Sequence, residues 1–328
     1  MILKGKNVLI TGGTGSFGQA YATHLLESQQ PNRLIIFSRD EQKHFDMQRS
    51  FAAYRDVVEF IIGDIRDKEK IQEAIKGMDY VIHTAAMKHM PMAEDHPLEA
   101  IKTNLLGTQN VIDACIAQGV KKVVALSTDK AALPINSYGA TKLLLERLFQ
   151  SADGKKSNPN TRFSLVRYAN VFGSKGSVVP VFQSLKATGK LPITDTEMSR
   201  FSIRMDEAIA LVNFAMHNGI GGEIIVPIAP SYTVGDMAEA ICPECTKEIV
   251  GHRQGEKMHE TLITPFEVAR TLKKDKYYII TPEGGSHSLE EYKNHYNGQL
   301  VSGLDEYSSG NNTLVLTPNQ IREQLVNF

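Results

Sequence analysis

Residues 7–18 read Asn-Val-Leu-Ile-Thr-Gly-Gly-Thr-Gly-Ser-Phe-Gly, and this stretch decides the fold class of the chain. Its apolar first part predicts a short strand from Asn7 to Thr11, and a helical pattern follows the glycines as far as Leu26. The first glycine permits a tight turn, the second lets the backbone approach a pyrophosphate, and the third lets the helix pack closely on the strand. A glycine-rich loop alone can be a simple turn, but strand, loop and helix in this order favour dinucleotide binding at the helix N-terminus. The residues expected to contact the dinucleotide here are Gly12, Thr14, Gly15, Ser16, Phe17 and Gly18.

The end of the second predicted strand indicates which dinucleotide is bound. This strand spans Arg33 to Phe37 and ends at Ser38 and Arg39, about 20 residues beyond the glycine motif. NAD-binding folds usually place an acidic residue there to hold the ribose 2′-hydroxyl, whereas an arginine accommodates a 2′-phosphate. Ser38 leaves room and Arg39 supplies charge, which favours NADP over NAD. Two alternatives remain: a shift of one residue would bring in the carboxylate of Asp40, or Arg39 is simply a solvated loop charge.

Apolar strands alternate with helices through the first half of the chain. Strands are predicted over residues 57–62, 80–83, 120–126 and 162–168, and helices over residues 40–54, 67–76, 98–118 and 137–151. Near-continuous apolar strands joined by helices predict a parallel sheet covered on both faces. Asp64 and Ile65, after the third strand, are expected at the adenine, and the small residues Ala85 and Ala86, after the fourth, let the chain pass close to the dinucleotide.

The regular alternation stops after residue 168, which indicates a second unit. We expect an α/β, Rossmann-type doubly wound parallel sheet from residues 1–168 and 205–229, since a helical pattern and a late strand return to it there. Residues 169–204 and 230–328 are expected to form a smaller α+β domain that binds the substrate. Residues 170–179, with Gly176 and Lys175, have the composition of a ligand-facing loop.

A second stretch, Leu126 to Leu144, concentrates proton carriers. It reads Leu-Ser-Thr-Asp-Lys-Ala-Ala-Leu-Pro-Ile-Asn-Ser-Tyr-Gly-Ala-Thr-Lys-Leu-Leu. Tyr138 and Lys142 are four residues apart and share one face of the predicted helix. A Lys142 ammonium would lower the phenol pKa and bond the nicotinamide ribose, so that Tyr138, with Thr128 as hydroxyl donor, could exchange a proton with an alcohol. A Tyr-x-x-x-Lys pattern is common by chance, but behind a dinucleotide loop and at the end of the fifth strand it indicates alcohol–ketone interconversion.

Charge and apolar patterning give no reason to expect nucleic acid or a membrane as a partner. The chain has 328 residues, 36 of them basic and 37 acidic, and a net charge of −1. No apolar run approaches the roughly 18 residues of a membrane span, and no signal-peptide apolar region precedes the first strand. We therefore expect a cytoplasmic protein, and also a homo-oligomer, either a dimer or a hexamer.

The cysteines and histidines predict no metal site. Three cysteines cannot build a disulfide framework, and their odd number suits a reducing compartment. Cys242 and Cys245 form one C-x-x-C, which could be half a zinc site or a redox pair, but no second pair exists and we expect it to be incidental. His83 and His89 lack metal-ligand spacing with any cysteine or carboxylate cluster.

Taken together, Thr11 to Gly18 and the Tyr138-x-x-x-Lys142 pattern resemble the extended short-chain dehydrogenase/reductase superfamily. More specific stretches resemble the configuration-inverting UDP-N-acetylglucosamine 4,6-dehydratases of the pseudaminic acid pathway, from the N-terminus to about Ile263. These stretches are Ser38-Arg39-Asp40-Glu41, Ala85-Ala86-Met87-Lys88-His89, Leu126-Ser-Thr-Asp-Lys-Ala131, Arg167-Tyr-Ala-Asn170, Gly176-Ser-Val-Val-Pro180 and Leu191-Pro-Ile-Thr-Asp-Thr196. Departures from the family pattern are Ala169, where relatives often carry glycine, and a Pro-Glu-Cys insertion around residues 243–245.

The resemblance implies an NADP-dependent nucleotide-sugar lyase of the EC 4.2.1 type. Its catalytic residues would be Thr128, Asp129, Lys130, Tyr138 and Lys142. Tyr138 would take the O4 proton of the sugar while C4 passes a hydride to NADP⁺. Lys130, if neutral, would then remove the acidified C5 hydrogen, and Asp129, if protonated, would give its proton to the departing C6 hydroxyl. Hydride return to C6 and protonation of C5 from the opposite face would give UDP-2-acetamido-2,6-dideoxy-β-L-arabino-hex-4-ulose.

By the same resemblance, a further set of residues would line the UDP-sugar site. They are Lys88, Asn170, Val178, Thr194, Arg253 and Glu256. Arg253 offers a fork for the pyrophosphate, and Glu256 could accept hydrogen bonds from the uridine ribose hydroxyls. The alternative for each charged member is an ordinary surface charge, and for Asp129 and Lys130 a surface ion pair at a strand end.

Two rival functions use the same fold. A related dehydratase would form or process the UDP-6-deoxy-N-acetylglucosamine-5,6-ene with the same residues. A protein of another class would bind NADP as a sensor without turnover, but such proteins usually lose the catalytic pair, and Tyr138 and Lys142 are both present.

Overall fold

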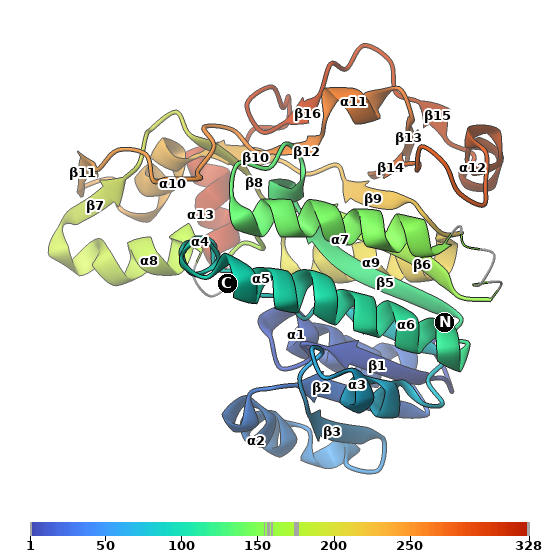
Figure 1. Ribbon diagram of the computed structural model, residues 1–328. Helices are drawn as coiled ribbons and strands as arrows, with labels where there is room; N and C mark the ends of the chain where they lie inside the picture. The colour runs from blue at the N-terminus through green and yellow to red at the C-terminus, as the bar shows by residue number, and fades with distance from the viewer. Residues whose placement is uncertain (1, 154, 156–157, 159, 174–176, 327–328) are drawn as a thin grey trace.

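A ten-stranded sheet forms the centre of the computed structural model, which describes residues 2–153, 155, 158, 160–173 and 177–326 (Figure 1). In spatial order the strands are β15 (Gln299–Leu300), β13 (Thr271–Lys274), β14 (Tyr277–Ile280), β9 (Ile224–Pro227), β6 (Arg162–Tyr168), β5 (Lys122–Thr128), β4 (Tyr80–His83), β1 (Asn7–Thr11), β2 (Arg33–Ser38) and β3 (Val58–Ile62). The strands from β9 to β3 pair in parallel, whereas β14, β13 and β15 add antiparallel strands beside β9.

Helices cover both faces of this sheet, as Figure 1 shows. One face packs on α1 (Ser16–His24), α2 (Glu41–Ser50) and α9 (Met205–Asn218), and the other on α3 (Lys68–Ile75), α6 (Thr108–Gln118) and α7 (Ser137–Asp153). Alternate strand residues point to opposite faces, so Val8 and Ile10 of β1 join the first core and Leu9 joins the second. Every residue of β5 is buried because both faces are covered. The predicted Rossmann-type doubly wound fold is confirmed.

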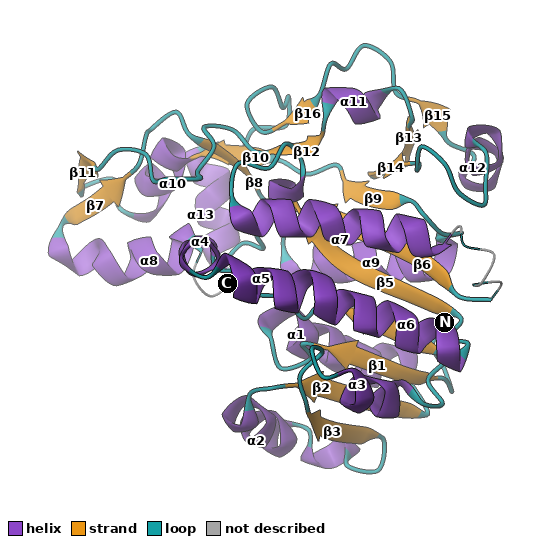
Figure 2. Ribbon diagram, in the orientation of Figure 1, coloured by secondary structure: helices purple, strands orange, loops and turns teal. Residues whose placement is uncertain are grey.

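A third hydrophobic core lies beyond the two that cover the faces of the main sheet. It is formed by α8 (Val178–Leu185), β7 (Lys190–Ile193), α10 (Val234–Ile241) and α13 (Pro318–Val326), and we call these elements, with the strand β11 (Thr246–Ile249) that pairs with β7, the second lobe. Figure 2 shows this lobe as a mixture of helices and strands at one end of the molecule. Short antiparallel pairs join it to the main body: β8 (Ser199–Phe201) with β10 (Ser231–Thr233), and β12 (Thr261–Ile263) with β16 (Tyr307–Ser308).

The remaining helices are short and lie between the larger elements. They are α4 (Met90–Asp95), α5 (Pro97–Ile101), α11 (Pro265–Val268) and α12 (Leu289–Tyr296). The predicted division into residues 1–168 with 205–229, and 169–204 with 230–328, stays a proposal. The strands β13, β14 and β15 belong to the main sheet, although the predicted division assigns all residues after 230 to the second unit.

Several predicted elements have the observed bounds, and others differ from them, the predicted helix over residues 98–118 most of all. β1, β4 and β6 match the expected residues. The predicted helix over 98–118 is instead α5, a π-helical segment (Lys102–Gly107) and α6. Asn104 of the π-helical segment hydrogen-bonds the backbone of Met87 and the Thr141 hydroxyl, contacts that no local pattern encodes. The expected loop over 170–179 gives way to α8 at Val178, and residues 174–176, with Lys175 and Gly176, lie outside the described residues.

The expectation that Cys242 and Cys245 are incidental is wrong. Cys242 ends α10 and forms a disulfide with Cys245, with the two Cα atoms 5.3 Å apart. Both side chains are buried in the core of the second lobe, so the bridge closes the turn between α10 and β11. Sequence spacing could not separate this pairing from a chance C-x-x-C, because the decisive fact is the backbone turn between them.

Two classes of feature are absent from the part of the chain that the structure describes. None of its helices combines the length and apolarity needed to cross a membrane. Its His, Cys, Asp and Glu side chains form no group of three or more that could hold a metal ion.

Candidate active site

The glycine turn between β1 and α1 has the geometry of a dinucleotide cradle. Gly12 has a φ of +65°, and a Cβ there would lie 2.8 Å from the backbone of Ala85. A Cβ on Gly18 would lie 2.6 Å from the Gly13 Cα, so the helix packs on the turn only with glycine at that position. Gly15 caps α1 without a side-chain hydrogen bond, which leaves the amides of the first turn free for a pyrophosphate. The residues present therefore fit the dinucleotide expected from the sequence.

Ser38 and Arg39 follow the same turn at the end of β2. The buried Ser38 hydroxyl lies 2.7 Å from the Thr14 hydroxyl and 2.9 Å from His44 Nε2. Arg39 is exposed, and its guanidinium lies 3.5 Å from the Asp64 carboxylate at the end of β3. The structure thus brings Thr14, Ser38, Arg39 and Asp64 together, with a cation free enough to meet a phosphate. Ile65, by contrast, is buried in the core.

Three expected catalytic residues form one buried cluster where β5 ends. The Thr128 hydroxyl donates to Asp129 Oδ1 at 2.7 Å, and Lys130 Nζ donates to the same oxygen at 3.0 Å. The cluster begins a short 3₁₀ turn, Asp129–Ala131, and all of its side chains are at least nine-tenths buried. Asp129 and Lys130 are therefore a buried ion pair and not the surface pair considered as the alternative.

Tyr138 and Lys142 lie on the first turns of α7 and face the end of β5. Burial raises the pKa of Tyr138 to about 12, although the positive charge of Lys130 and a hydrogen bond with Thr128 oppose this increase. Burial lowers the pKa of Lys142 to about 8, and its ammonium donates to the Leu126 carbonyl at 2.8 Å. The cation that lowers the pKa of Tyr138 is thus Lys130 and not Lys142, contrary to the sequence-based expectation.

The N-terminus of α7 is fixed by two side chains from other segments. Asn136 Oδ1 accepts the Gly139 N–H at 2.7 Å, and Glu94 of α4 accepts the Ser137 N–H. Asn136 also donates to the Gly255 carbonyl at 2.9 Å. These contacts hold Tyr138 at the end of β5 and tie α7 to the loop between β11 and β12.

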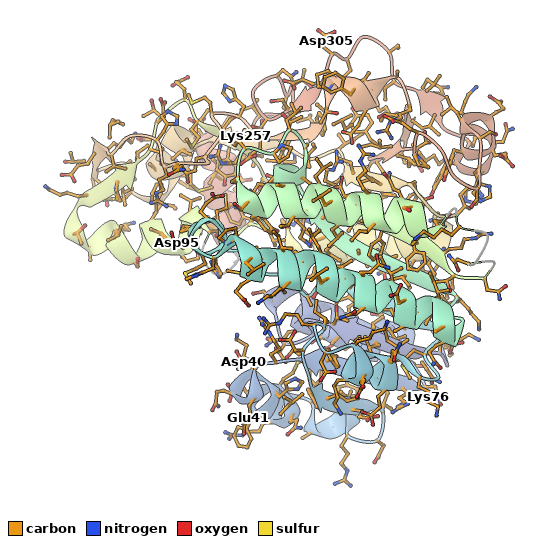
Figure 3. The ribbon with its side chains drawn as sticks, viewed as in Figure 1. Asp40, Glu41, Lys76, Asp95, Lys257 and Asp305 are labelled. Atoms are coloured by element: carbon orange, nitrogen blue, oxygen red, sulfur yellow. A yellow bond between two sulfur atoms is a disulfide. The ribbon has the colours of Figure 1, made fainter. Side chains whose placement is uncertain are left out.

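Residues from chain segments after α7 surround Lys130, and only one of them, Asn170, was expected from the sequence. Glu260 Oε1, just before β12, lies 3.7 Å from Lys130 Nζ and 3.9 Å from Arg200 Nε of β8. Lys257 donates to the Ala132 carbonyl at 2.5 Å, and Figure 3 shows its side chain close to the first turn of α7. Asn170, an expected substrate residue at the end of β6, accepts from Lys130 Nζ at 3.4 Å.

The other expected substrate residues lie on loops around this cluster. Arg253 and Glu256 belong to the β11–β12 loop that Asn136 and Lys257 tie to α7, and Arg253 is exposed. Glu256 has a buried carboxylate oxygen without a hydrogen-bond partner in the described residues. Their companions have no hydrogen bond to the Lys130 cluster among the described contacts: Lys88 precedes α4, Val178 begins α8, and Thr194 follows β7.

Glu260, Arg200 and Lys257 carried no local signal of function. Each is a single charged residue in a polar segment, and each reaches Lys130 or its loop only because β8 and β12 fold back over the end of β5. A charged residue that is buried by distant chain segments can be found only from the tertiary structure.

Comparisons with known proteins relate the whole chain to nucleotide-sugar enzymes. The model of the family described as polysaccharide biosynthesis protein matches residues 8–282. The inverting UDP-N-acetylglucosamine 4,6-dehydratase of Campylobacter jejuni strain 81-176 is 47% identical over 320 residues, covering 95% of this chain and 94% of the relative. The UDP-glucose 4-epimerase of Rickettsia felis is 38% identical over 332 residues, covering 98% and 96%.

Solved structures share the fold. Pen from Bacillus thuringiensis superposes with a TM-score of 0.91 at 37% identity, covering 100% of this chain and 99% of that chain. The dTDP-glucose 4,6-dehydratase DesIV from Streptomyces venezuelae, solved with NAD bound, has a TM-score of 0.68 at 19% identity, with 98% of both chains covered. At that identity the second likeness supports the fold alone.

Proposed function

The chain belongs to the polysaccharide biosynthesis protein family, and from this premise we propose that it is a UDP-N-acetylglucosamine 4,6-dehydratase that inverts C5. The observation that carries the proposal is the buried Asp129–Lys130 pair, 3.0 Å apart, next to the Thr128 hydroxyl and Tyr138. A redox site alone requires no such pair, whereas elimination of water needs a base and an acid. The 47% identity to an inverting dehydratase supports the same reaction.

NADP is the proposed cofactor, held by the glycine turn with Ser38 and Arg39 at the adenosine ribose. Arg39 would pair with the 2′-phosphate in addition to Asp64, since its guanidinium is more than half exposed at 55%. Lys142 would hold the nicotinamide ribose next to Tyr138. When bound, NADP⁺ accepts the hydride from C4 of the sugar and later returns it to C6.

Tyr138 removes the O4 proton in the first step. Burial raises its pKa to about 12 although a positive charge lies close by, and without that charge the phenolate would form less readily still. Lys130 supplies that charge from the end of β5, and Thr128 supports the phenolate by its hydrogen bond. The C4 ketone that results acidifies the C5 hydrogen.

The elimination needs a neutral Lys130 and a protonated Asp129. Burial alone would lower the pKa of Lys130, but the negative charges of Asp129 and Glu260 outweigh burial and raise that pKa above its usual range. Transfer of one proton along the 3.0 Å hydrogen bond converts the ion pair into the amine and the acid. Lys130 then takes the C5 proton, Asp129 protonates the departing C6 hydroxyl, and water leaves, which restores the ion pair. A proton from solvent then adds to C5 on the opposite face, and Tyr138 releases the O4 proton to solvent, which completes the inversion and restores the site.

The substrate would lie between the end of β5 and the β11–β12 loop. Asn170 would contact the sugar from beside Lys130, and Arg253 and Glu256 would take the pyrophosphate and the uridine ribose. Lys88, Val178 and Thr194 would complete the site from the surrounding loops. The enzyme would be a cytoplasmic homo-oligomer, a dimer or a hexamer, that acts as an EC 4.2.1 lyase in pseudaminic acid synthesis.

NMR of the product formed from UDP-N-acetylglucosamine tests this function. We expect a 6-methyl, 4-keto sugar with the L-arabino configuration, formed without added NADP because the cofactor is recycled. An exocyclic methylene signal as the sole product would instead establish the 5,6-ene reaction. Cofactor binding without turnover of any UDP-hexose would establish the sensor.

One further reaction is favoured by a specific observation, the 38% identity to a UDP-glucose 4-epimerase. A 4-epimerase also oxidises C4 but needs no acid–base pair for elimination. Incubation with UDP-glucose separates the two functions: an epimerase yields UDP-galactose with its C6 hydroxyl retained, whereas the proposed enzyme leaves this substrate unepimerised.

A further inference from the structure

Glu260 is a buried carboxylate whose side chain makes no hydrogen bond with the described residues. It is only 3% exposed, and its Oε2 has no hydrogen-bond partner among the described residues. The backbone is fixed by Ser309, whose hydroxyl accepts the Glu260 N–H at 2.9 Å and whose N–H donates to the Glu260 carbonyl at 2.8 Å. Buried polar groups are normally hydrogen-bonded, so structural pairing does not account for burying this charge.

The buried carboxylates of Glu146 on α7 and Glu267 on α11 are bonded quite differently from that of Glu260. Glu146 and Glu267 each accept two hydrogen bonds from Arg167, all between 2.7 and 2.9 Å. Glu260 instead faces two cations at longer range, Lys130 at 3.7 Å and Arg200 at 3.9 Å. Its contribution is therefore electrostatic and acts on both Lys130 and Arg200.

Glu260 is the second anion next to Lys130, after Asp129. The other charged or titratable groups that face this cluster are Arg200, Tyr138, Tyr232 and Lys257. All of these are cationic or neutral at neutral pH, so none of them favours the Lys130 ammonium. Asp129 must itself take a proton before elimination, whereas Glu260 takes no part in that proton transfer.

In the proposed function, on which this inference rests, Lys130 has two successive tasks. It must be an ammonium while Tyr138 loses its proton, and an amine when C5 loses its own. We propose that Glu260 is a positioning residue that keeps Lys130 protonated at the end of β5 during C4 oxidation. The N–H bond of Lys130 then breaks only when the O–H bond of Asp129 forms, after the ketone is in place.

The pH dependence of kcat in Glu260→Gln tests this role, because the substitution removes the charge and keeps the size. Loss of the anion lowers the pKa of Lys130, so the alkaline limb of the profile should move to lower pH. On the falling part of the profile, a shift of about one pH unit would place kcat roughly tenfold below that of the unaltered enzyme at the same pH, with KM within about twofold. With UDP-N-acetylglucosamine deuterated at C4, the isotope effect on kcat should grow as C4 oxidation becomes limiting.

Glu306→Gln is the matched control, because Glu306 acts electrostatically on Lys257 and is not among the main charges that act on Lys130. It should reproduce the original pH profile and isotope effect. Glu260→Asp, which retains the charge at a shorter reach, should place the alkaline limb between those of the unaltered enzyme and the Gln variant. If the Gln variant does not fold, the shift of the alkaline limb in the Asp variant tests the inference.

Alkaline limbs and isotope effects that coincide in the Glu260 and Glu306 variants would overturn the inference. So would a rise in KM with kcat unchanged, which would make Glu260 a binding residue. The product of the unaltered enzyme separates this failure from that of the proposed function: if it forms no 4-keto sugar, the function fails whatever Glu260 does.

Discussion

At the scale of single residues, the site depends on which charges surround one phenol. Tyr138 is at least nine-tenths buried, and its phenol faces Thr128 and the ammonium of Lys130. Lys142 lies one turn further along α7 and is held by the Leu126 carbonyl. In the proposed function, Lys130 acts on the phenol and Lys142 holds the cofactor ribose.

Replacement of Tyr138 by phenylalanine removes the proposed proton acceptor for O4. The side chain loses little volume. We expect kcat to fall by about 10²–10⁴-fold, while copurified dinucleotide, released by heat and identified chromatographically, stays at the level of the unaltered protein. Tyr232→Phe is the control, since Tyr232 is also a buried phenol near Lys130 but lies on β10, and it should keep activity within about threefold. Full activity in the Tyr138 variant contradicts the assignment for any substrate.

The sequence predicted that proposed site residues close together along the chain also lie together in the fold. Thr128, Asp129 and Lys130 end a strand, and Tyr138 follows within the same strand–loop–helix unit, so local spacing was sufficient. Glu260 was not predictable, because it reaches Lys130 through the pairing of β12 with β16, and nothing near residue 260 encodes that pairing. The pKa of Lys130 is raised first by Asp129 and second by Glu260, so the contact with Glu260 accounts for only part of that increase.

At the scale of elements, Glu223 holds the turn from α9 into β9 against β6. Its buried carboxylate accepts from the Ser164 hydroxyl at 2.5 Å and from the Gly221 N–H at 2.9 Å. Burial raises its pKa to about 7 from an ordinary value of 4.5. The elements were predicted from strand and helix patterns, but this buried acid depends on β6 and β9 lying side by side.

Glu223 makes stability depend on pH in a definite direction. Between about pH 4.5 and 7 the folded protein binds a proton that the unfolded chain has released, so the free energy of unfolding falls as pH rises. Glu223→Gln removes this term. The unfolding free energy of the unaltered protein minus that of the variant should therefore fall by about 3 kcal/mol from pH 4.5 to pH 7.5. Urea denaturation at several pH values measures it, and a difference independent of pH would rule out the titration.

At the scale of the whole molecule, one arginine joins three segments far apart in the sequence. Arg167 of β6 binds Glu146 of α7, Glu267 of α11 and the Leu262 carbonyl of β12. It lies beside Tyr168 at the end of β6, so it connects the catalytic edge of the sheet to the segment that carries Glu260. The sequence identified Arg167 only as part of a family motif, and its partners depend on the C-terminal segments returning to the sheet.

Arg167→Met leaves two buried carboxylates without their cation. We expect the free energy of unfolding to fall by roughly 3–5 kcal/mol, since breaking a buried ion pair leaves an uncompensated charge. Arg66→Met is the control, because Arg66 pairs with Asp64 and Glu99 at a partly exposed site and should cost about 1 kcal/mol or less. Guanidinium denaturation of both variants provides the comparison, and equal losses would show that the Arg167 network adds no stability of its own.

The state of the three cysteines makes the protein a convenient host for a single spectroscopic label. Cys115 is buried, and Cys242 and Cys245 are joined to each other, so none of them offers a reactive thiol at the surface. A cysteine introduced at Phe266, whose side chain is 79% exposed on α11, would then be the one position to react with a maleimide dye. Fluorescence from that dye would test the proposed arrival of substrate at the β11–β12 loop, which α11 follows in the chain after β12, without removal of any proposed site residue.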